Sequence, residues 1–185
     1  SSDVCSSDLV LSRIVIEAGT LPSWPGVIAL DTWPSGTHGI FATRDFEIID
    51  PDGGITARAT TAWFLIDRSS RRPARLPDRV TEIVLPDRPR ALVDDFARLP
   101  AVESSDSQME RAVGWSESDL NGHANHARMV GWLVDAMPSA WIQSHRLRRL
   151  QVQFRSEVTP GEVVQISHSN NGGSWCHAVQ SSDGR

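Results

Sequence analysis

The chain carries the same order of strand and turn signals twice, and this repetition limits its fold more than any other feature. Residues 11–53 and 147–184 each contain an alternating strand, a Pro-Gly pair, a second strand, a Gly-rich turn and a third strand ending at Asp-Gly. Alternation of polar and apolar residues between such turns is typical of antiparallel meanders. Two unrelated meanders would share generic turns, but the common order of all these features favours a duplicated unit.

A helical segment precedes the second copy. Residues 126–137 place apolar side chains such as Val130 and Val134 on one face at helical spacing. Pro138 is expected to end this helix, since the residue before a proline resists the α conformation. After its Asp-Gly turn the first copy continues as a strong strand over residues 55–67.

Each copy therefore predicts a long helix wrapped by antiparallel strands, which is the hotdog arrangement. The expected fold class is α+β, with tandem hotdog domains whose first helix and last strands lie outside this chain. Residues 1–8, SSDVCSSD, resemble a translated sequencing adapter, and we expect them to be a non-native tag. A partial N-terminal hotdog is expected over 9–76, a linker over 77–110 and a partial C-terminal catalytic hotdog over 111–185.

The linker is rich in proline and charge, and we expect one short helix in it at residues 91–99. Among the tryptophans, Trp63 and Trp132 are expected to lie in the core, because large aromatic side chains usually fill cores.

Composition excludes several classes of partner. The net charge of −5 argues against nucleic-acid binding, which depends on basic side chains that neutralise phosphates. No apolar run approaches the roughly 20 residues that a membrane-spanning helix needs. The two cysteines form neither a zinc spacing nor a disulfide framework. We therefore expect a cytoplasmic protein without a membrane, nucleic-acid, cofactor or metal requirement.

The stretch SDLNGHANHARMVGW places Asp119, Asn121 and His123 directly before the predicted helix. The N-terminal amides of that helix are expected to point at these residues, where they would stabilise an oxyanion. An imidazole or carboxylate can take a proton from water. No GxSxG motif is present, and Cys176 is distant in sequence. Taken alone, such a pattern is more often a plain turn. If it is catalytic, it suits cleavage of a thioester by activated water; a weak metal site at Asp119, His123 and His126 is a further alternative.

The stretch beginning at Asp119 resembles the Asp-x-Asn-x-His-x-Asn motif of the acyl–acyl carrier protein thioesterases. These are double-hotdog enzymes that end fatty-acid synthesis in bacteria and plastids. Residues 44–77 resemble the first-domain hairpin of this family, and VQFRSEV (152–158) resembles its strand carrying a Glu-Cys pair. The three segments occur in family order, and the resemblance covers residues 9–185.

The resemblance implies four active-site residues: Asp119, Asn121, His123 and Glu157. Asn121 is expected to orient the substrate or the attacking water, His123 and Glu157 to activate that water, and Asp119 to hold the network. Where many relatives have a cysteine after the glutamate, this chain has Val158, so activity must rest on Glu157 and water. Alternatively, Glu157 is a solvent-facing strand residue, since its segment alternates.

The resemblance also implies the reaction, which is hydrolysis of the thioester of fatty acyl–acyl carrier protein. The alternatives are an acyl-CoA thioesterase of the hotdog superfamily and a non-catalytic acyl-binding hotdog protein. The expected partner is an acylated carrier protein, and a homodimer is left open. Two arginine groups suit either docking of an acidic carrier or simple solvation: residues 68, 71, 72 and 75, and residues 146, 148 and 149.

Overall fold

The computed structural model describes residues 7–23, 25–102, 105 and 107–182, and the chain forms two compact units. The first unit contains Ser1–Arg98 and Leu147–Phe154, and the second contains Leu99–Arg146 and Arg155–Arg185. The predicted tag lies outside the described residues except for Ser7 and Asp8, which begin the first strand.

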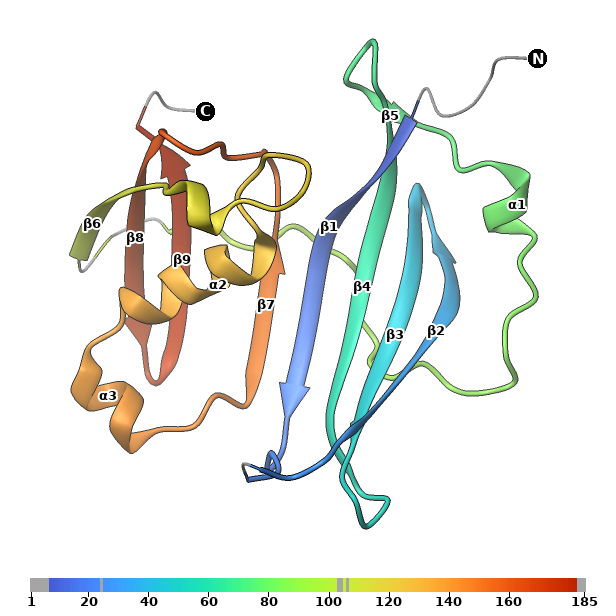
Figure 1. Cartoon of the computed structure of the whole chain (residues 1–185), viewed down its shortest axis with the longest axis horizontal. Helices are drawn as coiled ribbons and strands as arrows, with labels where there is room; N and C mark the ends of the chain where they lie inside the picture. The colour runs from blue at the N-terminus through green and yellow to red at the C-terminus, as the bar shows by residue number, and fades with distance from the viewer. Residues whose placement is uncertain (1–6, 24, 103–104, 106, 183–185) are drawn as a thin grey trace. The chain divides into compact units, whose positions relative to one another are not determined.

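The first unit is built on one antiparallel sheet with the strand order β2-β3-β4-β1-β7, and β5 pairs with β4 (Figure 1). The last strand on this path comes from the second sequence repeat and pairs with β1. The strands are β1 (Ser7–Ala18), β2 (Ala29–His38), β3 (Phe41–Ile49), β4 (Ile55–Asp67), β5 (Pro73–Ala74) and β7 (Arg149–Gln153).

Two predicted turns join these strands. The β2–β3 turn uses Gly39 at φ +58°, and the β3–β4 turn uses Gly53 at φ +85°, a region that favours glycine. In the second turn, Asp50 Oδ1 accepts hydrogen bonds from the amides of Asp52 and Gly54. The predicted strand over 55–67 is confirmed, because β4 spans the same residues.

The predicted helix at 91–99 is wrong. That segment is irregular, and the linker instead contains the short helix α1 (Asp78–Thr81). Asp94 forms a buried ion pair with Arg13 of β1 at 3.1 Å, and Arg13 Nη1 also donates to the carbonyl of Ala97 at 2.7 Å. These contacts with a distant strand hold the segment in a non-helical conformation, so tertiary pairing overrides its local propensity.

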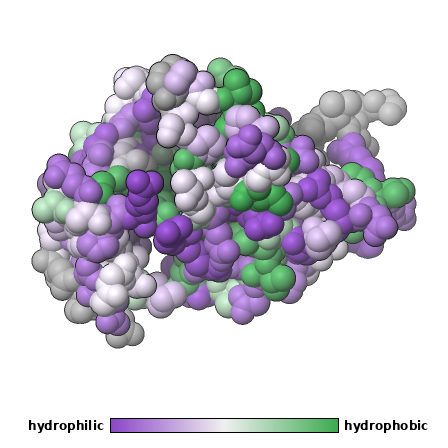
Figure 2. Space-filling model, turned by 90° about the horizontal axis from the view of Figure 1, so that it is seen from below, coloured by the Kyte–Doolittle hydropathy of each residue, from purple (hydrophilic) through white to green (hydrophobic). Residues whose placement is uncertain are grey.

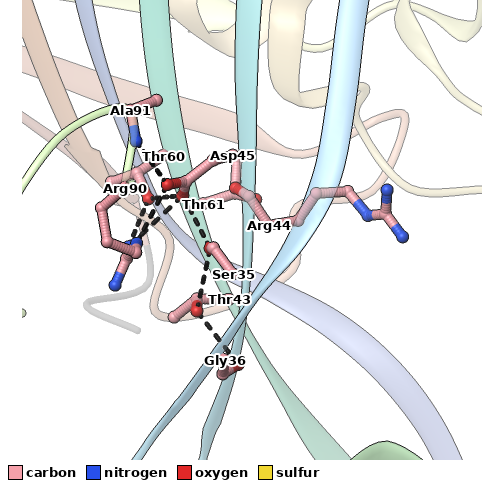
Figure 3. Close-up of polar contacts among 9 residues, drawn as sticks. All are labelled: Ser35, Gly36, Thr43, Arg44, Asp45, Thr60, Thr61, Arg90 and Ala91. Carbon is pink, nitrogen blue, oxygen red and sulfur yellow. Dashed lines mark hydrogen bonds and ion pairs between the residues drawn. The ribbon is translucent and has the colours of Figure 1, made fainter. Parts of the chain in front are cut away.

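A second buried carboxylate holds the linker at Asp45 of β3, which is fully buried. Its two oxygens accept hydrogen bonds from Arg90 Nε at 2.9 Å, from the Ala91 amide at 2.7 Å and from Ser35 Oγ at 2.8 Å. The hydroxyl of Thr60 also donates to this carboxylate (Figure 3). Because a buried charge is stable only when it is paired and hydrogen-bonded, this network fixes the linker on the sheet.

The second unit packs helices on a smaller antiparallel sheet of order β6-β8-β9. The helix α2 covers the sheet through Trp132, which is 1% exposed and packs with the buried Val164 and Ile166. The elements of this unit are β6 (Ser107–Ala112), η1 (Trp115–Glu117), α2 (His126–Asp135), α3 (Ser139–Ser144), β8 (Val163–Asn171) and β9 (Ser174–Ser181).

A helix across an antiparallel sheet confirms the α+β hotdog prediction in this unit, and the predicted helix at 126–137 is confirmed with an earlier end. Trp132 is a core residue as expected, whereas Trp63 is only half-buried, and its Nε1 donates to Thr61 Oγ1 at 2.8 Å.

Hydrophobic and hydrophilic residues are mixed on the surface of the protein that Figure 2 shows. No helix within the described part of the chain is both long enough and apolar enough to cross a membrane.

Candidate functional site

The loop that precedes α2 is closed by its own hydrogen bonds. The Asp119 amide donates to the His123 carbonyl at 2.8 Å, and the Gly122 amide donates to the Asp119 carbonyl at 3.1 Å. Gly122 has φ +78°, which a residue with a Cβ rarely adopts. The loop therefore presents Asp119, Asn121 and His123 from one tight turn.

The carboxylate of Asp119 holds this turn from within. Its Oδ1 accepts the amide of Asn121 at 2.8 Å and the amide of His123 at 3.3 Å. Desolvation raises the pKa of Asp119, but these amide hydrogen bonds and the nearby His123 outweigh it and lower the pKa below its ordinary value. Asp119 is therefore ionised at neutral pH and bonded to the backbone that carries His123.

The structure brings His123 and Glu157 together. His123 Nε2 lies 3.4 Å from Glu157 Oε2, and each side chain is 34% exposed. The backbone connects their segments, because the Ala124 amide donates to the Val158 carbonyl at 2.7 Å. Partial exposure and this separation allow one water molecule to contact both groups.

The placement of Glu157 on a strand is wrong. Strand β7 ends at Gln153, and Glu157 lies in an irregular segment. The backbone of the next residue bonds to the loop before α2, and buried Val158 packs in the core around Trp132. The side chain of Asn121 is exposed on the loop, four residues before α2 reaches its cap at Asn125.

Asn125 caps α2. Its Oδ1 accepts the Ala127 amide at 2.9 Å. An asparagine immediately before the helical pattern is the signal that could have identified it. This hydrogen bond uses the amide of Ala127, one of the N-terminal helix amides that were expected to point at Asp119, Asn121 and His123.

The residue after the cap, His126, is partly buried. Burial lowers its pKa, and the charge of Asp119 opposes that shift.

Sequence reasoning also missed Glu117. Its carboxylate accepts hydrogen bonds from Arg111, Trp132 and the Gly114 amide. The glutamate three residues after Gly114 matches the capping-box position and could have marked it. The contact with Trp132 spans a distance in sequence that no local pattern indicates.

The metal alternative finds no support in the parts of the chain that the structure describes. Within them, no group of three or more His, Cys, Asp or Glu side chains is arranged to hold a metal ion.

Comparison with family models gives two matches in sequence order. Residues 8–84 match the acyl-ACP thioesterase N-terminal domain, and residues 101–185 match the acyl-ACP thioesterase C-terminal domain.

Curated relatives are similar along nearly the whole chain. A chloroplastic palmitoyl-acyl carrier protein thioesterase of Gossypium hirsutum is 28% identical over 183 residues, which cover 91% of this chain and 44% of that protein. A chloroplastic acyl-[acyl-carrier-protein] hydrolase, FATB1 of Cuphea viscosissima, is 29% identical over 196 residues, which cover 98% of this chain and 47% of that protein. The chain thus spans less than half the length of these relatives.

Solved structures share the fold. The 12:0-ACP thioesterase from Umbellularia californica superposes with a TM-score of 0.85 at 24% identity, covering 96% of this chain and 71% of that one. An acyl-ACP thioesterase from Bacteroides thetaiotaomicron gives 0.83 at 22% identity, covering 96% and 72%.

Proposed function

Because the chain belongs to the acyl-ACP thioesterase family, we propose that it hydrolyses the thioester of fatty acyl–acyl carrier protein and releases free fatty acid. The observation that carries this proposal is the 3.4 Å approach of His123 Nε2 to Glu157 Oε2 at a site open to water. The relatives named as carrier-protein thioesterases support the choice of substrate.

In the proposed mechanism, one water molecule contacts both His123 and Glu157 and gives up a proton to this pair as it attacks. Its oxygen bonds to the thioester carbon, and negative charge develops on the carbonyl oxygen. When the tetrahedral intermediate collapses, the carbon–sulfur bond breaks, and the proton passes from the pair to the departing thiolate. A positioned base of this kind contributes about 10²- to 10⁴-fold to a rate.

Asn121 and Asp119 have supporting roles in this proposal. The exposed amide of Asn121 lies on the same loop as His123, where it can orient the substrate carbonyl or the attacking water. Asp119 holds that loop through its hydrogen bonds to the Asn121 and His123 amides. Val158 supplies no nucleophile, since its side chain is a buried hydrocarbon.

The direct test is release of free thiol from matched acyl–carrier protein and acyl-CoA substrates of the same chain lengths. Faster turnover of the carrier-protein substrate supports the proposal. Faster turnover of acyl-CoA would move the protein to the acyl-CoA thioesterases. Acyl binding without thiol release would identify a non-catalytic acyl-binding protein and end the proposal.

An acylated carrier protein is the proposed partner. A homodimer and a cytoplasmic location stay predictions, and the curated plant relatives are chloroplastic. Sedimentation of the purified protein tests whether it forms a homodimer.

A further inference from the structure

The side chain of Glu117 accepts hydrogen bonds from three elements of the second unit. Glu117 lies two residues before Asp119, and its side chain is 14% exposed. Its carboxylate accepts hydrogen bonds from Arg111 Nη2 at 2.6 Å, from Trp132 Nε1 at 2.8 Å and from the Gly114 amide at 2.9 Å. These donors belong to the end of β6, the centre of α2 and the start of η1, so one side chain fixes where all three meet.

The surroundings of Glu117 keep it charged and fixed. The hydrogen bonds from the Gly114 amide, Arg111 and Trp132 lower the pKa of Glu117 to about 2. The Arg111 guanidinium also lies 5.5 Å from the centre of the Trp132 ring. The carboxylate therefore satisfies the N–H of a core indole and anchors its own backbone to the most buried part of α2.

A series of backbone contacts leads from Glu117 to the site. The Glu117 carbonyl accepts the amide of Asn125 at 2.8 Å, and Ser118 and Ala124 form an isolated β-bridge. The next contact outward joins Asp119 to His123, as described above. The base of the loop that carries His123 is thus fixed at Glu117.

The same series reaches Glu157. The Ala124 amide donates to the Val158 carbonyl, and Glu157 directly precedes Val158. A movement of residues 117–118 would therefore shift His123 relative to Glu157, whose neighbour Val158 is packed in the core.

We propose that Glu117 is a positioning residue that sets the separation of His123 and Glu157 without contacting the substrate. This inference rests on the proposed function, in which that pair activates water. Misplacing a reacting group by about 1 Å can cost about a hundredfold in rate.

The substitution Glu117→Gln tests this role. Glutamine keeps the size of the side chain but replaces one acceptor oxygen with a donor, which would face either the Gly114 amide or the N–H groups of Arg111 and Trp132. We expect kcat for acyl–carrier protein hydrolysis to fall by up to about a hundredfold, while KM changes little because Glu117 does not contact the substrate. The matched control is Asp67→Asn in the first unit, where hydrogen bonds from Ser69 and Ser70 lower the pKa of Asp67 to about 2. We expect this control to lower the melting temperature and leave kcat unchanged.

Amide hydrogen exchange followed by NMR supplies a readout that does not depend on activity. In Glu117→Gln, the amides of Asp119, Ala124 and Asn125 are expected to exchange about tenfold faster, while those of β8 keep their protection. Asp67→Asn should change none of them.

Unchanged kcat in a folded Glu117→Gln, or faster exchange spread evenly over the second unit, would overturn the positioning role. If the unmodified protein releases no thiol, the proposed function fails, and the exchange pattern alone decides whether Glu117 fixes the loop.

Discussion

Two charged pairs, one in each unit, differ in their exposure to solvent. In the first unit, Arg13 and Asp94 are 5% and 3% exposed, and the pair holds the linker to the sheet. In the second unit, His123 and Glu157 are each 34% exposed and approach to 3.4 Å. The first pair is sealed from solvent, and the second is open to it.

The two kinds of charged group are therefore expected to affect different properties, folding stability in one case and catalysis in the other. Breaking the hydrogen-bond network of a buried carboxylate such as Asp45 destabilises the fold, because removing one partner leaves the others without compensation. A half-exposed imidazole and carboxylate contribute little to folding, yet they can bind and deprotonate water. Mutations of the buried charged groups in the first unit should therefore reduce stability, and mutations of the His123–Glu157 pair should reduce turnover.

The largest expected effect is on turnover. His123→Ala and Glu157→Ala are each expected to reduce kcat by about 10²- to 10⁴-fold, because either change removes one contact of the attacking water. Melting temperatures should stay close to that of the unmodified protein. Thiol release under saturating substrate measures the first quantity and circular dichroism the second. Full turnover by both variants would contradict the assignment.

The next largest effect is on folding. Asp45→Asn is expected to lower the free energy of unfolding by about 1–3 kcal/mol, because the donors around this carboxylate, including the partly exposed Arg90, then lose a charged acceptor. Urea denaturation measures it. Asp52→Ala, at an exposed turn, is the control and should change stability by less than about 0.5 kcal/mol. Equal effects of the two changes would show that the linker network does not stabilise the first unit.

The contrast between the units also explains which features the sequence could predict. Strand β4 and helix α2 were predictable because their side-chain periodicity is local. The linker was not, because the contacts that hold residues 91–99 come from Arg13 and Asp45, which lie on distant strands. A helical pattern cannot reveal an ion pair formed across such a distance in sequence.

The candidate site divides in the same way. The spacing of Asp119, Asn121 and His123 before a helix was visible in one short stretch. Glu157 was identified through a family resemblance, and the structure places it in a loop instead of a strand. Glu117 was missed because its importance depends on Trp132, fifteen residues away in sequence.

A smaller effect is expected on the pH dependence of stability, where His177 and Glu117 of the second unit act in different pH ranges. Burial, with the nearby charge of His168, lowers the pKa of His177 to about 4 from 6.5. The unfolded chain therefore binds an extra proton below pH 6.5, and stability should fall as the pH drops from 6.5 through 4. Glu117, with a pKa of about 2 against 4.5, adds stability above pH 4.5 that is lost as the pH falls through 2.

Thermal unfolding at stepped pH checks both ranges. His177→Gln should flatten the stability curve between pH 6.5 and 4 and leave the more acidic range unchanged. A curve that keeps its slope between pH 6.5 and 4 in this variant would show that another group titrates there.

The smallest expected effect is that of introducing a cysteine at residue 158, where this chain has a valine. Val158→Cys is expected to leave kcat within about twofold, because attack depends on water held by His123 and Glu157; similar volume keeps the stability cost of such a change under about 1.5 kcal/mol. Thiol release and iodoacetamide sensitivity measure this. A large gain in turnover that iodoacetamide abolishes would show that a thiol at residue 158 takes over the attack.

The central claim is that His123 and Glu157 act on the same water molecule, and a double-mutant cycle on thiol release tests it most directly. If they share one water, kcat of the combined His123→Ala and Glu157→Ala variant should lie within about threefold of the slower single variant, since groups acting as a unit are not additive. A combined loss equal to the product of the two single losses would mean that the residues act independently, and would contradict the shared-water mechanism.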